Sequence, residues 1–184
     1  MTIQRCSWCS SDPLYIAYHD QEWGKAEHDE QRLFEMLCLE GQQAGLSWIT
    51  VLKKRDCYRQ HFFQYPIAQI ATFTDDHLED KLSDAGLIRH LGKLKAIRDN
   101  AIAWQQLQQE VGNISTWLWS FVNQQPIHND VPDARNAPAQ TEISQKLSKT
   151  LKKRGFKFVG PTTCYAFMQA TGMVNDHENH CSFK

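Results

Sequence analysis

Apolar residues recur at helical spacing along nearly the whole chain. Between His90 and Glu110 they stand three or four positions apart, as on one face of a long amphipathic helix: Leu91, Leu94, Ile97, Ala101, Trp104 and Leu107. No stretch alternates convincingly between apolar and polar residues with the period of two that marks a half-buried strand. The pattern therefore predicts an all-α protein without internal repeats or low-complexity segments.

Capping residues divide the rest of the chain into shorter helices. Asp29, Ser47 and Asp56 each precede an apolar helical segment and are predicted N-caps. Thr74 precedes an acidic first turn, which suits a helix N-terminus. Helices are expected over 48–55, over 116–122, over 142–154 and from Pro161 to Gly172, and another is expected after Asp56 with Tyr58 and Phe62. A surface loop is expected over 127–140 and a turn over 155–160.

The size and composition indicate a globular protein outside the membrane. A chain of 184 residues with 41% hydrophobic residues suits one compact domain, here expected over 1–184 as two helical lobes. No apolar run approaches the ~20 residues of a transmembrane helix, and the N-terminus has no apolar signal-peptide core. We therefore expect a cytoplasmic protein with reduced thiols and no membrane partner.

The charge is balanced overall but segregated along the chain. Lys and Arg number 20 against 21 Asp and Glu, which taken alone argues against a nucleic-acid-binding protein. Residues 1–50, however, hold eight acidic and three basic residues, whereas residues 141–157 hold six basic residues and one acidic residue. The basic run is either a solvated helix face or the binding site of an anionic partner.

The six cysteines fall into two groups. Three lie within apolar helical patterns and are predicted to be small core residues: Cys38, Cys57 and Cys164. Three others lie near the chain ends among histidines: Cys6, Cys9 and Cys181. In a cytoplasmic protein an even number of cysteines does not by itself indicate disulfides.

Metal-type ligands stand at both ends of the chain. Cys6 and His19 are 13 positions apart, and His177 and Cys181 are four apart, a spacing that can place both on one helix face. Two Cys and two His suit a closed tetrahedral zinc site, which contributes to folding and leaves no position open for catalysis. The alternative to a metal site is a set of unrelated terminal residues. Two further candidates for the ligand set are Cys9 and His180.

Residues 147–166 have the pattern of a helix, a tight apolar turn and a new helix N-terminus, with lysines around the turn. Such a turn presents backbone N–H groups and the positive end of a helix dipole to an anion. It resembles a helix-hairpin-helix motif, which holds a DNA phosphate through these amides. Of the common Gly-hydrophobic-Gly turn, Val159 and Gly160 are present but Phe158 replaces the first glycine. The alternative is an ordinary corner between two helices.

The first quarter of the chain holds a cluster of aromatic and polar residues: Trp8, Tyr15, Tyr18, Trp23, Glu40, Gln42, Gln43 and Trp48. Glu40 ends an apolar helical stretch and is followed by Gly41, so its carboxylate could face a pocket whose aromatic rings stack on a planar ligand. Alternatively, the aromatic residues are core and Glu40 is a solvated helix end.

Taken together, these residues resemble the 3-methyladenine DNA glycosylase I family, the constitutive bacterial alkylation-repair enzymes. Long runs match in order, spanning Cys6 to Cys181, so the resemblance is specific. The matching stretches are Asp12-Pro-Leu-Tyr-Ile-Ala-Tyr-His-Asp20 with Glu22-Trp-Gly24, residues 33–55, Asp84-Ala-Gly-Leu-Ile-Arg-His90, Trp119-Ser-Phe-Val-Asn123, residues 151–160, Phe167-Met-Gln-Ala170 and Val174-Asn-Asp-His177.

The resemblance implies a helix-hairpin-helix glycosylase fold, with a structural zinc that joins the N- and C-terminal segments. The family pattern selects as zinc ligands Cys6, His19, His177 and Cys181. It also implies that Glu40 contacts the damaged base, that Tyr18 and Trp48 form the stacking pocket, and that Trp8 and Trp23 line its surroundings. The expected phosphate contacts in the hairpin are Lys157, Phe158, Val159 and Gly160.

The implied activity is that of a monomeric glycosylase acting on alkylated double-stranded DNA. It would flip out 3-methyladenine and excise it hydrolytically, leaving an abasic site; no lysine nucleophile is invoked, so strand cleavage is not expected. Most helix-hairpin-helix glycosylases carry a catalytic Asp some twenty residues after the hairpin. Asp176 lies 16 residues after Gly160, directly beside His177, and is a poor substitute. We therefore place the key carboxylate at Glu40.

Two other functions are compatible with the same residues. A zinc hydrolase would activate water on its metal and would need an open coordination position. A non-catalytic DNA-binding module stabilised by zinc would keep the basic hairpin but would not release a base.

Overall fold

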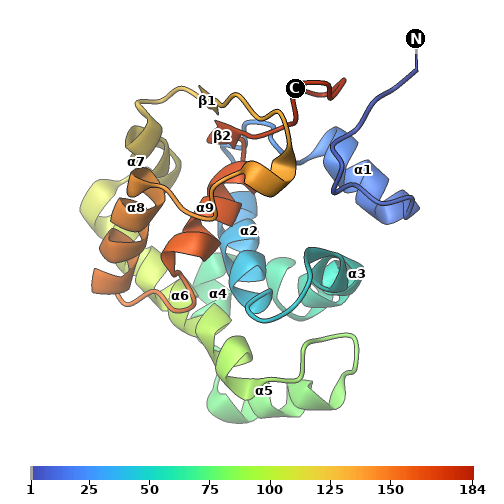
Figure 1. The fold of residues 1–184 in the computed structure, drawn as a ribbon. Helices are drawn as coiled ribbons and strands as arrows, with labels where there is room; N and C mark the ends of the chain where they lie inside the picture. The colour runs from blue at the N-terminus through green and yellow to red at the C-terminus, as the bar shows by residue number, and fades with distance from the viewer. Residues whose placement is uncertain (1) are drawn as a thin grey trace.

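The protein is described here by a computed structural model, which covers residues 2–184 (Figure 1). Over these residues the chain is mostly helical, with one very small sheet. Its helices are α1 (Pro13–Gln21), α2 (Glu30–Gln42), α3 (Trp48–Tyr58), α4 (Ile67–Ile70), α5 (Asp75–Asp80), α6 (Leu91–Val111), α7 (Ile114–Trp119), α8 (Glu142–Lys153) and α9 (Pro161–Ala170), and its strands are β1 (Ile127–His128) and β2 (Val174–Asn175).

Most helix boundaries follow the predicted caps. Asp29 accepts a hydrogen bond from the Arg32 amide at 2.9 Å at the start of α2, and Thr74 caps α5 through the His77 amide at 3.2 Å. The long helix expected between His90 and Glu110 is α6, and Pro161 occupies the first turn of α9 as predicted. Local polar chemistry therefore sets the helix starts around a core that the apolar periodicity identifies.

One predicted boundary and one predicted capping bond are wrong. Asp56 does not start a new helix: α3 runs through it to Tyr58 and continues as a π-helical turn over Arg59–Phe63. Tyr58 and Phe62 are both buried, and the continuous helix keeps both rings in the core. Ser47 precedes α3 as expected, but its hydroxyl pairs with the Thr50 hydroxyl at 2.8 Å instead of capping a backbone amide.

Three further features were not predicted correctly. Helix α1 was missed, although Asp12 caps it and Pro13 opens it. The all-α prediction omitted β1 and β2, which pair in parallel with Ile127 opposite Val174; strands of two residues are too short to show an alternating pattern. Cys57, expected in the core, is only half-buried, whereas the other two predicted core cysteines are fully buried.

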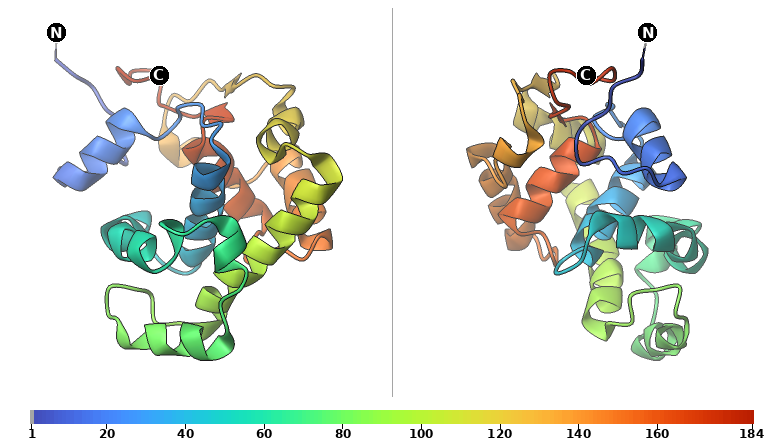
Figure 2. Two further views of the ribbon diagram at one scale, coloured as in Figure 1. Left: turned by 180° about the vertical axis from the view of Figure 1, so that it is seen from behind. Right: turned by 45° about the vertical axis from the view of Figure 1, so that its right-hand side comes forward.

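Helix α2 runs through the centre of the molecule, where it packs against α3, α6, α7 and α9 (Figures 1 and 2). Large aromatic side chains fill the space around it: Phe34, Tyr58, Phe62, Trp104, Trp119, Tyr165 and Phe167. The two ends of the described chain lie on the same side of the molecule, where the Ser182 amide donates to the Gln4 carbonyl at 2.8 Å. No helix within residues 2–184 is long and apolar enough to cross a membrane.

Candidate functional site

A cavity of about 220 Å³ opens between α1, α2, the start of α3 and α9. The five residues predicted to surround a base all line it: Trp8, Tyr18, Trp23, Glu40 and Trp48. Tyr15 and Gln43, from the same aromatic and polar cluster, line it as well. The remaining wall comes from distant parts of the chain that sequence reasoning did not connect to the pocket: Ala134, Ala137, Ala166, Gln169 and Asp176.

Glu40 brings a carboxyl group into this cavity without a protein partner. It lies near the C-terminal end of α2 and is only 5% exposed, and no hydrogen bond or ion pair reaches its carboxyl group from residues 2–184. Burial raises the pKa of Glu40 to about 8. Such a group strongly favours a cationic ligand, because a nearby positive charge offsets the cost of ionising it.

Tyr18 and Trp48 form an aromatic corner beside Glu40. Their ring centroids are 5.4 Å apart and their planes are inclined by 44°. Because the two rings already contact one another, a planar ligand would stack against this pair, not between its members. Trp48 also carries a buried indole N–H for which residues 2–184 supply no hydrogen-bond acceptor.

Asp176 also lies in the pocket wall, but its carboxylate is held by three neighbours. One oxygen accepts from the Asn129 amide at 2.7 Å; the other accepts from the Tyr165 hydroxyl and from the Gln169 amide, the latter at 2.9 Å. This geometry suits an anchor for the pocket wall, whereas Glu40 has no such bonds.

A buried group of four metal-type donors lies behind the pocket. The sulfur and nitrogen atoms of Cys6, His19, His177 and Cys181 all lie within 4.8 Å of one another. The Cys6 and Cys181 sulfurs are 3.3 and 3.4 Å from His177 Nδ1. A tetrahedral zinc with ordinary Zn–S and Zn–N bonds gives S···N separations of about 3.5 Å. The donor set and its spacing therefore fit zinc.

Hydrogen bonds to the donors orient them further. His19 Nδ1 lies 2.7 Å from an Asp20 oxygen, and Asp20 in turn pairs with Arg5. His177 Nε2 lies 3.0 Å from the Trp23 carbonyl, which leaves His177 Nδ1 toward the sulfurs. Carboxylate and carbonyl partners of this kind accompany metal-bound histidines.

The two alternative ligand candidates lie outside this group. The Cys9 sulfur donates to the Ser10 carbonyl at 3.7 Å, and the His180 ring is exposed and lies near the Arg5 carbonyl. The structure therefore brings together the four residues that the family pattern selects.

The four-donor group and the pocket share a wall. The Trp8 ring packs on the His19 ring with centroids 5.1 Å apart, and the Trp23 ring packs on the His177 ring at 4.7 Å. Glu178, which sequence reasoning missed, is 1% exposed. Its carboxylate accepts hydrogen bonds from the Ser7 hydroxyl and the Ala134 amide, both at 2.7 Å. The chain termini thus position one side of the pocket.

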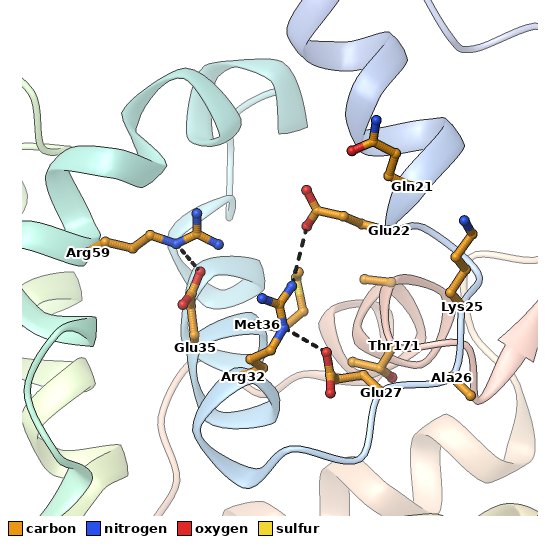
Figure 3. Close-up of a pocket in the computed structure, with 11 residues that line it drawn as sticks. Gln21, Glu22, Lys25, Ala26, Glu27, Arg32, Glu35, Met36, Arg59 and Thr171 are labelled. Atoms are coloured by element: carbon orange, nitrogen blue, oxygen red, sulfur yellow. Dashed lines mark hydrogen bonds and ion pairs between the residues drawn. The ribbon is translucent and has the colours of Figure 1, made fainter.

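An ion-pair network holds the C-terminal end of α1, and Figure 3 shows the contacts of Arg32 with Glu22 and Glu27 in it. Glu22, just after α1, makes a bidentate pair with Arg55 of α3 at 2.7 and 2.8 Å. Arg32 of α2 pairs with Glu27 at 2.7 Å, and its guanidinium lies 3.9 Å from Glu22. The Arg55 guanidinium also lies 6.0 Å from the centre of the Tyr18 ring. The network thereby fixes α1, and Tyr18 with it, against α2 and α3.

The predicted hairpin joins α8 to α9 as expected. Phe158 has a left-handed backbone with φ of +53° and an exposed side chain, while Val159 is buried. No residue among 2–184 accepts a hydrogen bond from the amides of 158–160. The Lys157 amide differs from the prediction, because it already donates to Asn100 Oδ1 at 2.7 Å. Of Lys157, only the exposed side chain is left to bind an anion, whereas the amides of residues 158–160 are free of partners within 2–184.

Comparison with known proteins identifies the family of this chain. Residues 8–184 match the family described as methyladenine glycosylase. The chain belongs to this family. It is 56% identical to the DNA-3-methyladenine glycosylase of Haemophilus influenzae over 98% of this chain and 97% of that protein. It is 54% identical to DNA-3-methyladenine glycosylase 1 of Escherichia coli over 97% of this chain and 96% of that protein.

Solved structures of the methyladenine glycosylase family have the same fold. A crystal structure of 3-methyladenine DNA glycosylase I superimposes with a TM-score of 0.94 at 54% identity, over 97% of this chain and 98% of that one. The enzyme from Staphylococcus aureus superimposes with a TM-score of 0.95 at 34% identity, over 100% of this chain and 98% of that one. The family resemblance and the expected glycosylase class are thereby confirmed.

Proposed function

We propose that this chain is a DNA-repair glycosylase that flips 3-methyladenine out of alkylated double-stranded DNA and hydrolyses its N-glycosyl bond. The observation that carries the proposal is Glu40, a buried carboxyl group beside an aromatic corner, which no residue among 2–184 pairs. Relatives named DNA-3-methyladenine glycosylase support the substrate, as does a family structure that is 34% identical and contains bound 3-methyladenine.

Recognition follows from the charge of the damaged base. Methylation at N3 makes the adenine ring cationic, so the ring attracts the faces of Tyr18 and Trp48 by roughly 0.5–2 kcal/mol more than a neutral base. Glu40 accepts a hydrogen bond from the exocyclic 6-amino group. The cationic ring also lowers the pKa of this carboxyl group and favours its ionised form, whereas neutral adenine brings no charge to offset the cost of ionisation.

The chemical step needs little acid catalysis, because the cationic base is already a good leaving group. The C1′–N9 bond breaks, and its electron pair neutralises the departing ring. Water forms the new C1′–O bond and gives up a proton to solvent. Among residues 2–184 no lysine lines the pocket to attack C1′, so the product is an abasic site in an intact strand, and the enzyme is monofunctional.

In this proposal the hairpin supplies the contact with the DNA backbone, as it does in helix-hairpin-helix glycosylases. Gly160 opens α9 with φ of −63°, and a Cβ atom added there would meet no atom within 4 Å. The fold itself therefore does not require glycine at this position. Its missing side chain leaves room for a phosphate close to the free amides of residues 158–160.

Zinc has a structural part in this proposal. When bound by Cys6, His19, His177 and Cys181, it supplies a cross-link between the chain ends. Four protein ligands leave no open position for water, which favours a glycosylase over a zinc hydrolase. We infer a single, monomeric glycosylase domain over 1–184, with two helical lobes and termini joined by this site.

Incubation of methylated duplex DNA with the purified protein, followed by chromatography of the released bases, tests the proposal. We expect 3-methyladenine in the free fraction and alkali-sensitive abasic sites in the DNA. Strands that remain uncut before alkali treatment would confirm the monofunctional assignment. Binding of the duplex without any base release would instead identify a non-catalytic DNA-binding module.

A further inference from the structure

Asn100 connects the longest helix to the hairpin. It lies on α6 with only 2% of its surface exposed. Its Oδ1 accepts from the Lys157 amide at 2.7 Å, and its Nδ2 donates to the Lys157 carbonyl at 3.2 Å. One side chain therefore satisfies both backbone groups of the residue that enters the hairpin turn, 57 positions along the chain.

This polar residue occupies a position where an apolar one would be expected. Its neighbours Ile97, Ala101 and Trp104 on α6 are buried apolar residues. A buried amide is costly unless its donor and acceptor are paired, and pairing makes its geometry specific. Asn100 pairs its acceptor and a donor with the backbone of Lys157, and its Nδ2 also makes a longer contact, at 3.9 Å, with the Cys38 sulfur of α2. The two bonds to Lys157 are the shorter ones, so the main contribution of Asn100 is the placement of that residue.

The hairpin is fixed on its far side as well. The buried Ser148 hydroxyl of α8 donates to the Val159 carbonyl at 2.6 Å. Phe158, between these two anchors, holds a left-handed backbone that non-glycine residues rarely adopt. The turn that carries the free amides of residues 158–160 is therefore anchored at both Lys157 and Val159.

We propose that Asn100 is a positioning residue for DNA binding, which presets the hairpin amides for a backbone phosphate. The inference rests on the proposed role of the hairpin. A preset loop loses less conformational freedom on binding than a mobile one. Asn100 itself touches neither the base pocket nor the DNA, so its loss should weaken DNA affinity and leave base recognition intact.

The test is Asn100→Leu in the zinc-loaded full chain, with a short duplex that carries a central abasic analogue as the probe. We expect its Kd to rise about tenfold or more, and the apparent KM for methylated duplex to rise in parallel. The kcat for base release and the affinity for free 3-methyladenine should stay within about twofold of wild type. The slope of log Kd against log salt should not change, because no cation is removed.

Three further variants serve as controls. Gln31→Leu removes a comparable amide, which donates to the Phe63 and Tyr65 carbonyls away from the hairpin; its DNA affinity should match wild type. Asn100→Asp keeps the acceptor for the Lys157 amide and should fall between wild type and Asn100→Leu, which matters if the leucine variant folds poorly. Gly160→Ala tests the hairpin itself and should weaken DNA binding.

The outcomes separate this inference from the proposed function. If Gly160→Ala weakens DNA binding but both Asn100 variants bind like wild type, the positioning role of Asn100 is overturned and the hairpin role stands. If neither Gly160→Ala nor Asn100→Leu affects DNA binding, the hairpin role itself fails. Equal losses of DNA affinity, kcat and free-base affinity in Asn100→Leu would show a general structural defect and also overturn the inference.

Discussion

Glu40 combines a stability cost with a binding advantage at one residue. Burial without a partner raises its pKa to about 8, so the folded protein holds a proton on this group where the unfolded chain does not. Below the pKa of the unfolded chain, Glu40 is protonated in both states and does not lower the free energy of unfolding. As the pH rises from there toward 8, the unfolded chain ionises this group freely and the folded protein does not, so the free energy of unfolding falls. At neutral pH the free protein therefore carries a carboxyl group that lowers its stability, and a bound cationic ligand offsets this cost.

Glu40→Gln should accordingly stabilise the free protein and impair its function. At pH 8 we expect the free energy of unfolding to rise by about 1 kcal/mol or more, because the amide carries no charge to desolvate. The gain should vanish near pH 5. Affinity for 3-methyladenine should fall at least about tenfold. Thermal denaturation from pH 5 to 9 and titration with the free base measure the two effects.

Glu35→Gln is the matched control on the same helix. Glu35 is also largely buried, but it pairs with Arg59 at 2.8 Å. Its replacement should lower stability and leave affinity for the base unchanged. If Glu40→Gln bound and excised the base like wild type, the role of Glu40 would be refuted.

At the scale of helices, Gly41 shows how closely the pocket and the hairpin are joined. Gly41 follows Glu40 in α2, and a Cβ atom there would lie 3.1 Å from the Phe158 Cβ and 3.2 Å from the Phe158 carbonyl oxygen. The missing side chain thus lets the hairpin backbone rest on α2.

Gly41→Ala should therefore destabilise the protein, although alanine favours a helix by about 1 kcal/mol over glycine. The added methyl meets backbone that cannot move without displacing the hairpin, so we expect a net loss of about 1–2 kcal/mol and weaker DNA binding. Chemical denaturation measures the first effect and duplex titration the second.

Gly92→Ala, in α6, is the corresponding control. A Cβ atom at Gly92 would meet only the ring of His90, at 3.0 Å. The His90 ring caps α6 through the Lys93 amide at 3.0 Å, so a weakened cap offsets the helix preference of alanine and this variant should stay within about 1 kcal/mol of wild type. A Gly41→Ala variant at least as stable as wild type would contradict the close packing of hairpin and helix.

The sequence predicted the elements well where local chemistry decides them and poorly where tertiary contacts do. Asp29 and Thr74 cap their helices as expected, because capping depends on only three or four neighbouring residues. Strand β1 exists only because β2, 47 residues later, lies beside it. The π-helical turn after Tyr58 likewise follows from burying Phe62, a consequence of packing that capping residues do not reveal.

For the whole molecule, the same distinction separates the two halves of the pocket. The residues that carry its chemistry lie within positions 8–48 and could be grouped from the sequence. Ala134, Gln169 and Asp176 complete the wall because the C-terminal part of the chain packs against the N-terminal part. No local sequence pattern predicts this long-range contact. The Cys and His residues near both ends of the chain were the sequence signal for this contact. The family resemblance was needed to choose the four metal ligands among six candidate residues.

The four-donor group joins the two ends of the chain, and this predicts the effect of metal removal. A cross-link over a loop of this length contributes about 5 kcal/mol in the chain-entropy account. For a protein of this size we therefore expect metal removal to lower Tm by at least about 10 °C. Base affinity should also fall, because Trp8 and Trp23 pack on ligand rings His19 and His177. The hairpin lies outside this cluster, so affinity for undamaged duplex should fall less than affinity for free base.

Metal analysis, calorimetry and the two titrations test this on wild type with and without a strong chelator, and on Cys6→Ser. We expect one zinc per wild-type chain and less than one in Cys6→Ser, whose Tm should approach that of the chelated protein. Cys9→Ser is the matched control, since Cys9 lies three residues away and outside the four-donor group; it should keep its zinc and its Tm. Wild type that contains no zinc as purified, and whose Tm does not change with the chelator, would remove zinc from the fold and leave the chain ends joined by packing and hydrogen bonds alone.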